Sequence, residues 1–198
     1  MRYSPDHKAA TRERVLREAA TALREHGTAG VSVADIMKRA GLTHGGFYAH
    51  FESKDDMIGH AVEYMFDQRY ATVLSYEGLK DPGEALAAFV DDYLSLDHRD
   101  RPETGCPIPA LSAELSRMES GACLQFRNGY ERLVVRMSKL LRPAHGANAT
   151  PLTKSALAEM VGSLVVARAL PDPESANFLK NARSQVKSRL GSGRKKAS

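Results

Sequence analysis

Residues 31–54 read VSVADIMKRAGLTHGGFYAHFESK, and this stretch decides the expected fold. Ser32 is suited to cap a short helix, with Asp35 three residues later as an acidic variant of the capping box. Gly41 stands where the chain has to turn, and Thr43 opens another short helix through about His50. Two short helices joined by a tight glycine turn are typical of a helix-turn-helix motif.

The second helix of this motif divides into buried and exposed positions. Leu42, Phe47 and Phe51 are spaced to pack inward. Two adjacent glycines cost an ordinary helix about 1 kcal/mol each relative to alanine. They indicate either close approach of the backbone to another surface or a loop beside core aromatics. The residues left to face outward are Thr43, His44, Gly45, Gly46, Tyr48 and His50.

Helical patterns also dominate the rest of the chain. Apolar residues recur at helical spacing over residues 9–26, where Gly27 ends the helix, and Ser53 opens a helix that runs to about residue 74. Asp81-Pro82 opens the next helix. Further helices are expected over 108–118, 120–141, 152–170 and 173–190, with polar loops at 97–107 and 142–151. The predicted fold class is therefore all-α.

Composition limits the function without defining it. The 198 residues carry a formal net charge of +4, which permits nucleic-acid binding but does not demand it. The N-terminus is charged and no apolar run is long enough to cross a bilayer, so we expect a cytoplasmic protein without membrane contact. Two cysteines are too few for a disulfide framework or zinc cluster. No catalytic motif, cofactor or metal site is predicted.

Four short segments around the motif form a specific pattern: Thr28 to Ile36, Ala40 to Thr43, Gly46 to Phe51 and Ser53 to Asp55. This pattern resembles the TetR family of bacterial transcription regulators. The resemblance implies an N-terminal helix-turn-helix DNA-binding domain over residues 1–52. It also implies a C-terminal helical ligand-binding and dimerisation domain over 53–190, and residues 191–198 read as a flexible basic tail.

The resemblance assigns roles in binding double-stranded DNA, with a homodimer on a near-palindromic operator. The residues implied at base edges are Thr43, His44, Gly45 and Gly46. The residues implied at the DNA backbone or at the start of the motif are Ser32, Val33, Tyr48, His50 and Lys54, the last reinforced by a helix N-terminus. The basic residues Lys8, Arg12, Arg14 and Arg17 form either further phosphate contacts or a solvated face.

The family also implies a small-molecule effector bound in the C-terminal domain. Aromatic and sulfur-bearing side chains on the predicted helices line apolar pockets, but they also build ordinary cores, so both interpretations stay open. The candidate effector-binding residues are Phe66, Tyr70, Phe89, Tyr93, Cys106, Phe126 and Tyr130.

Two apolar stripes near the C-terminus are candidates for a dimer interface. They lie at helical spacing on the last two predicted helices, and an intramolecular core is the alternative. The candidate residues are Leu157, Val161, Leu164, Val165, Phe178, Ala182 and Val186.

The function implied is that of a repressor that a small molecule releases from its operator. Cys106 offers an alternative, because a cysteine at a helix N-terminus tends towards the reactive thiolate. Its Gly-Cys-Pro element resembles one in a TetR branch that includes electrophile-sensing repressors, although a small buried residue fits the position equally well. An enzyme acting on small electrophiles is the weaker alternative, because no base accompanies Cys106.

Overall fold

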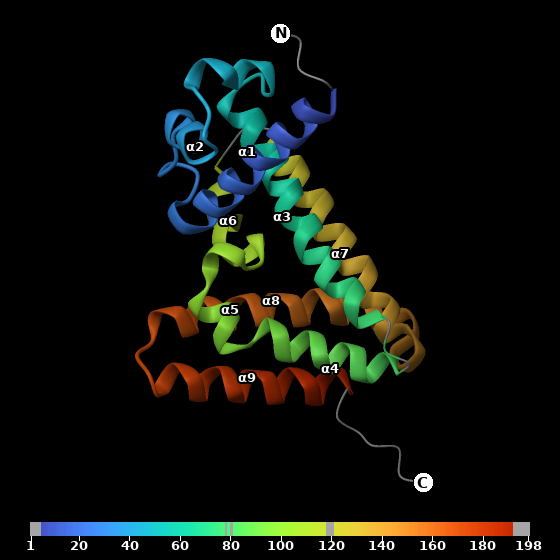
Figure 1. Ribbon diagram of the computed structural model, residues 1–198. Coiled ribbons are helices and arrows are strands. Elements are labelled where there is room, and N and C mark those ends of the chain that lie inside the picture. Colours follow the sequence, from blue (N-terminus) through green and yellow to red (C-terminus); the bar gives the residue numbers. More distant parts are fainter. Residues whose placement is uncertain (1–4, 78, 80, 118–120, 192–198) are drawn as a thin grey trace. The chain divides into compact units, whose positions relative to one another are not determined.

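The computed structural model describes residues 5–77, 79, 81–117 and 121–191 (Figure 1). Every regular element among them is a helix, which confirms the predicted all-α class. In chain order they are α1 (Pro5–His26), α2 (Val33–Arg39), the 3₁₀ helix η1 (His44–Ala49), α3 (Lys54–Glu77), α4 (Pro82–Tyr93), α5 (Leu96–Asp100), the 3₁₀ helix η2 (Pro102–Thr104), α6 (Pro107–Leu115), α7 (Gly121–His145), the 3₁₀ helix η3 (Gly146–Asn148), α8 (Ala149–Ala169) and α9 (Glu174–Leu190).

The capping signals of the N-terminal segment act as predicted. The Ser32 hydroxyl accepts a hydrogen bond of 3.1 Å from the backbone N–H of Asp35 and so caps α2. Gly27 and Gly41 end their helices with φ of 70° and 68°, a left-handed conformation that favours glycine. The Ser53 hydroxyl accepts from the Asp56 N–H at 3.0 Å and opens α3. Local chemistry therefore fixes the helix boundaries around the motif.

The second helix of the motif is a 3₁₀ helix rather than the α-helix expected. Its hydrogen bonds span three residues, from Gly46 N to Thr43 O at 3.1 Å and from His50 N to Phe47 O at 2.9 Å. Thr43 occupies the N-cap position, but its side chain makes no capping bond. Six residues that include two glycines favour this tighter, short form over an α-helix.

Both predicted polar loops contain helices, so these two expectations were wrong. In the first, Ser95 caps α5 by accepting from His98 N at 3.0 Å, and Arg168 donates to the backbone oxygen of His98 at 2.8 Å. In the second, α7 continues through Pro143 to His145, whose Nε2 hydrogen-bonds the backbone oxygen of Leu190 at 3.1 Å. Arg168 and Leu190 lie far away in sequence from the segments that they contact, and the local pattern does not reveal such contacts.

The chain folds as two compact units. The first comprises Met1–Gln68 and Pro102–Gly129, and its buried core includes Leu23, Ile36, Phe47 and Met65. The second comprises Arg69–Arg101 and Tyr130–Ser198, where α8 and α9 lie side by side (Figure 1). The boundary at residue 52 between a DNA-binding and a ligand-binding domain stays a prediction. Of the predicted basic tail, residues 192–198 lie outside the described residues.

Candidate nucleic-acid interface and effector region

The η1 segment separates buried from exposed side chains as its pattern predicts. Phe47 is buried at 1% exposure, whereas Tyr48, the next residue, is 71% exposed. The two rings meet edge to face with centroids 5.3 Å apart, so Phe47 supports Tyr48 from below. Thr43, His44 and Gly45 are exposed and Gly46 is half-buried. The segment therefore presents a tyrosine, a histidine and bare backbone to its surroundings.

The paired glycines are not required by packing within the chain. A Cβ placed on Gly45 meets nothing within 4 Å, and one on Gly46 lies 3.7 Å from Met37 Cε, an ordinary contact. Neither glycine has a positive φ. Glycine here therefore leaves the outward face of η1 free of side chains rather than relieving strain inside the fold.

His50, at the end of η1, lies near the basic face of α1. Burial lowers the pKa of His50 below its ordinary value, and the charges of Lys8 and Arg12 lower it further, so the ring is neutral near pH 7. Its Nδ1 atom is buried without a hydrogen-bond partner among the described residues. Arg12 lies with its guanidinium carbon 4.9 Å from the centre of the Phe51 ring. These contacts bring positive charge from α1 to the C-terminal end of η1.

The remaining candidates for DNA contact lie at helix starts. Exposed Ser32 uses its hydroxyl within the chain, donating to Asp35 Oδ2 at 2.6 Å, while half-buried Val33 begins α2. Lys54 begins α3 and is half-buried. Its backbone is fixed because Asp56 Oδ2 accepts from Glu52 N at 3.0 Å. Lys54 is therefore held in place at a helix N-terminus.

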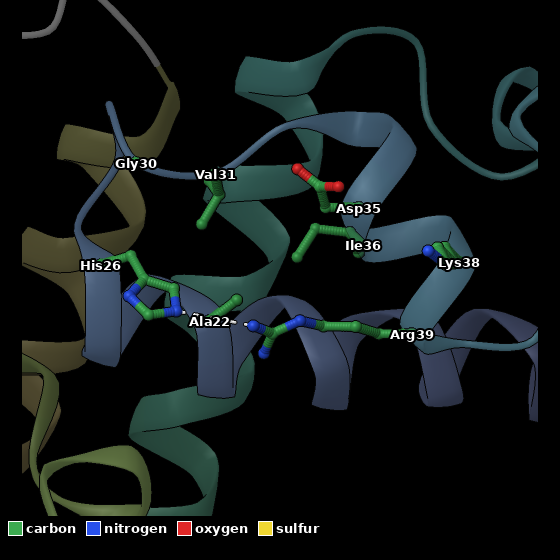
Figure 2. A pocket seen from close by; sticks show the side chains of 8 residues that line it. All are labelled: Ala22, His26, Gly30, Val31, Asp35, Ile36, Lys38 and Arg39. Carbon is green, nitrogen blue, oxygen red and sulfur yellow. Dashed lines mark hydrogen bonds between the residues drawn. The ribbon is translucent and has the colours of Figure 1, made fainter.

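Two open hollows lie on the helices of the N-terminal segment. One of about 540 Å³ lies between α1 and α2, where His26 and Arg39 face each other with ring and guanidinium nitrogens 3.5 Å apart (Figure 2). Its lining mixes both signs of charge, with Asp35 beside Lys38. The other, of about 360 Å³, runs along α1 and is lined by His7, Ala10, Thr11, Glu13, Arg14 and Arg17.

Three of the effector candidates fall in the first unit. Phe66 and Phe126 meet edge to face with centroids 5.6 Å apart. Gly129 belongs to the same contact, because a Cβ there would lie 2.2 Å from Phe66 Cδ2. Cys106, the third, is 1% exposed at the N-cap of α6. Neither Cys106 nor Cys123 forms a disulfide.

Arg24 lies near Cys106 and is buried, although charged residues are usually found at the surface. It is 7% exposed, and it donates from Nη1 to the backbone oxygen of Glu103 at 3.2 Å and from Nη2 to Gln68 Oε1 at 3.1 Å. Burial lowers the pKa of Arg24 to about 10, partly offset by the nearby Cys106. Its place four residues after buried Ala20 was the available signal.

The other four effector candidates fall in the second unit. Phe89 and Tyr93 are buried on α4 with ring centroids 5.8 Å apart. Tyr70 accepts a hydrogen bond of 2.6 Å from Arg136 Nε. Tyr130 is half-buried, and burial raises its pKa. The seven candidates thus form two groups, one in each unit.

The candidate dimer residues differ in how far the chain itself covers them. Leu157, Leu164 and Val186 are at most 1% exposed, so they serve the core of this chain. Val165 is 45% exposed, and the half-buried members are Val161, Phe178 and Ala182. Beside Val161, a Cβ on Gly162 would meet nothing within 4 Å. The surface available to a partner is therefore narrower than the predicted stripes.

The described residues hold no group of three or more His, Cys, Asp or Glu side chains placed to bind a metal ion. None of their helices is long and apolar enough to span a membrane.

Comparison with known proteins supplies the family. Residues 15–61 match the model for bacterial regulatory proteins of the tetR family. A TetR transcriptional regulator from Chloroflexus aurantiacus superposes with a TM-score of 0.80 at 26% identity, over 94% of this chain and 96% of that one. Residues 15–61 thus match the DNA-binding segment of the TetR family, and the chain has the fold of a TetR regulator. The family confirms the predicted helix-turn-helix.

Curated relatives match this chain over about half of its length. An HTH-type regulator of Mycobacterium tuberculosis is 32% identical over 108 residues, 52% of this chain and 52% of its own. The HTH-type transcriptional repressor KstR2 of Mycolicibacterium smegmatis is 30% identical over 100 residues, 48% of each chain. The matched part thus spans about half the length of these relatives. Family membership defines the fold and the class of regulator, while partners and effector depend on the residues of this chain.

Proposed function

We propose that this TetR-family chain is a homodimeric repressor that binds a near-palindromic operator and leaves it when a small molecule binds. The observation that carries the proposal is the outward face of η1, where exposed Tyr48 stands beside the bare backbone of Gly45. A tyrosine hydroxyl suits a phosphate oxygen, and a surface without side chains can approach base edges closely. Thr43 and His44 supply the polar groups for reading sequence.

A homodimer would match the two-fold symmetry of a near-palindromic operator. Two copies joined through the open part of the α8–α9 face would present two η1 segments to half-sites on one side of the duplex. Exposed Val165 and half-buried Val161 and Phe178 support this surface. An exposed apolar valine on a helix beside an unfilled glycine position favours close helix approach.

For an effector to release the DNA, its binding has to change the position of the helix-turn-helix motif. Thr28, in the turn before α2, donates from its backbone N at 2.6 Å and its hydroxyl at 2.8 Å to Glu114 Oε2 on α6. Arg24 ties α1 to η2 in the same unit. A ligand that prefers a different position of α6 would therefore act on α1, as population shift requires.

The test begins with DNA selected by the purified protein from a random pool at stated salt. Fluorescence anisotropy then compares the selected operator with random duplex. Tyr48→Ala and Lys54→Ala should weaken binding to both, because phosphate contacts position without specifying sequence. His44→Ala should change the preferred sequence, by about 1–3 kcal/mol per base read. Equal losses on both duplexes for all three variants would reject η1 as the reading element.

The electrophile-sensing alternative is the weaker candidate. The buried guanidinium of Arg24 lies near Cys106, which supports it. Two features oppose it: Cys106 is 1% exposed, and Pro107 and Pro109 remove two N–H donors from the first turn of α6. N-ethylmaleimide should therefore react faster with half-buried Cys123, measured by peptide mass, and faster reaction at Cys106 would reverse this preference.

A further inference from the structure

A second buried arginine, Arg69, lies among aromatic rings in the second unit. Its side chain is 9% exposed. The guanidinium carbon lies 5.3 Å from the centre of the Phe89 ring and 5.0 Å from that of Tyr93. Both rings are fully buried. Arg69 is thus a charged group held within an apolar, aromatic environment.

One edge of this guanidinium is paired and the other is not. Nη1 lies 2.8 Å from Asp92 Oδ2, an ion pair. Nε and Nη2 are buried and have no hydrogen-bond partner among the described residues. These two nitrogens share one edge of the planar group, and their parallel N–H bonds match the two oxygens of a carboxylate. A buried donor left unsatisfied is rare, so a pair of them on one edge calls for an explanation.

The charge around Arg69 favours a monoanion. Asp92 contributes one negative charge, while Arg69 and Arg168 contribute two positive charges. Burial, with a contribution from Arg69, lowers the pKa of His98 to about 4, so this ring is neutral at physiological pH. Among the charged groups that act on His98, the two arginines thus outnumber the one carboxylate. A single carboxylate would balance this difference, whereas a phosphate dianion would exceed it.

We infer that Arg69 is the anchor for an organic monocarboxylate whose apolar body packs against Phe89 and Tyr93. This assignment rests on the proposed function, because it specifies the chemical class of the releasing effector. A second copy of the chain is a poorer source of the carboxylate, since Nε and Nη2 are already buried within one chain. The ligand joins Arg69 on α3 to the two rings on α4, both in the same unit.

The test uses the full-length protein without DNA, so that its outcome is independent of operator binding. Isothermal titration calorimetry would measure octanoate and benzoate against their neutral amides and against inorganic phosphate. The carboxylates should bind and raise the melting temperature, and the amides should not. Arg69→Gln should weaken carboxylate binding about 10- to 150-fold, the loss expected for hydrogen bonds to a charged group. Arg69→Lys should weaken it less, because charge remains without the paired edge.

Arg136→Gln is the matched control, because Arg136 lies 5.1 Å from the Tyr70 ring in the same unit. It should bind the carboxylates as the wild type does. Equal binding of acids and amides, tighter binding of phosphate, unchanged affinity in Arg69→Gln and Arg69→Lys, or no binding by either acid would overturn the inference. Adding the carboxylate to the protein–operator complex then tests release separately. If the protein binds the carboxylate but stays on the operator, the proposed release mechanism is rejected while the carboxylate site stands.

Discussion

Substitution of Gly45 by alanine should change stability and DNA affinity in opposite directions. Gly45 is exposed, its φ is not positive, and a Cβ there meets nothing within 4 Å. Alanine therefore fits the native backbone and restricts the unfolded chain, which stabilises proteins by about 0.4–1 kcal/mol. For a chain of 198 residues this corresponds to a rise in melting temperature of about 1–4 °C.

The same methyl group should weaken operator binding. If the backbone of η1 approaches base edges, the added group occupies space that the DNA needs and displaces a contact worth about 1–3 kcal/mol. Operator affinity should then fall about 5- to 150-fold. Differential scanning fluorimetry measures the first effect, and fluorescence anisotropy at fixed salt measures the second.

Gly121→Ala is the matched control, because a Cβ at this exposed glycine also meets nothing within 4 Å. Gly121 begins α7 and is not among the residues proposed to contact DNA, so its substitution should leave operator affinity unchanged. Unaltered affinity in Gly45→Ala would refute close approach of η1 to DNA. A fall in its melting temperature would refute the conclusion that the fold does not need glycine at this position.

Two further predictions concern assembly and pH. Val165→Glu should convert the dimer to monomers in sedimentation, since it places a charge in the proposed seam, whereas Val135→Glu, at a 53% exposed valine on α7, should remain dimeric. The pKa of His98 is about 4 when folded, below its ordinary value, so the unfolded chain binds the proton first and stability should fall by about 3 kcal/mol as pH drops from about 6.5 to about 4. His98→Asn, which keeps a donor for the Tyr93 oxygen, should flatten this dependence in urea titrations, and an unchanged slope would exclude His98 as its source.

The fold was predictable wherever a local signal sets a boundary. Ser32 and Ser53 cap their helices through neighbours three residues away, and Gly27 ends α1 with its own backbone conformation. α5 also has a local cap, since Ser95 accepts from His98 N, but Arg168, some 70 residues away, supports it by donating to the backbone oxygen of His98. Such a partner leaves no trace in local periodicity, so the segment resembled a loop.

The exposed residues of the candidate site were predictable from the sequence, and its buried arginines were not. Exposed Tyr48 above buried Phe47 follows from the pattern of the motif. Arg24 and Arg69 were missed because charged residues are expected at the surface. Each nevertheless falls in the apolar register of its helix, Arg24 four residues after buried Ala20 and Arg69 four after buried Met65. A charged residue at an apolar position of a helix therefore indicates a buried charged group.

The joint between α1 and α6 explains how a buried event could reach the motif without a ligand near η1. Gly27 has a φ of 70° and lies against the Glu114 carboxylate, since a Cβ there would lie 2.2 Å from Oε1, and the same carboxylate holds Thr28 through two hydrogen bonds. We expect a shift of α6 to act on the turn that leads into α2 through this carboxylate. Since a hydrogen bond to a charged group contributes about 1.5–3 kcal/mol, the loss of one of these two bonds matches a typical allosteric coupling energy of about 1–3 kcal/mol.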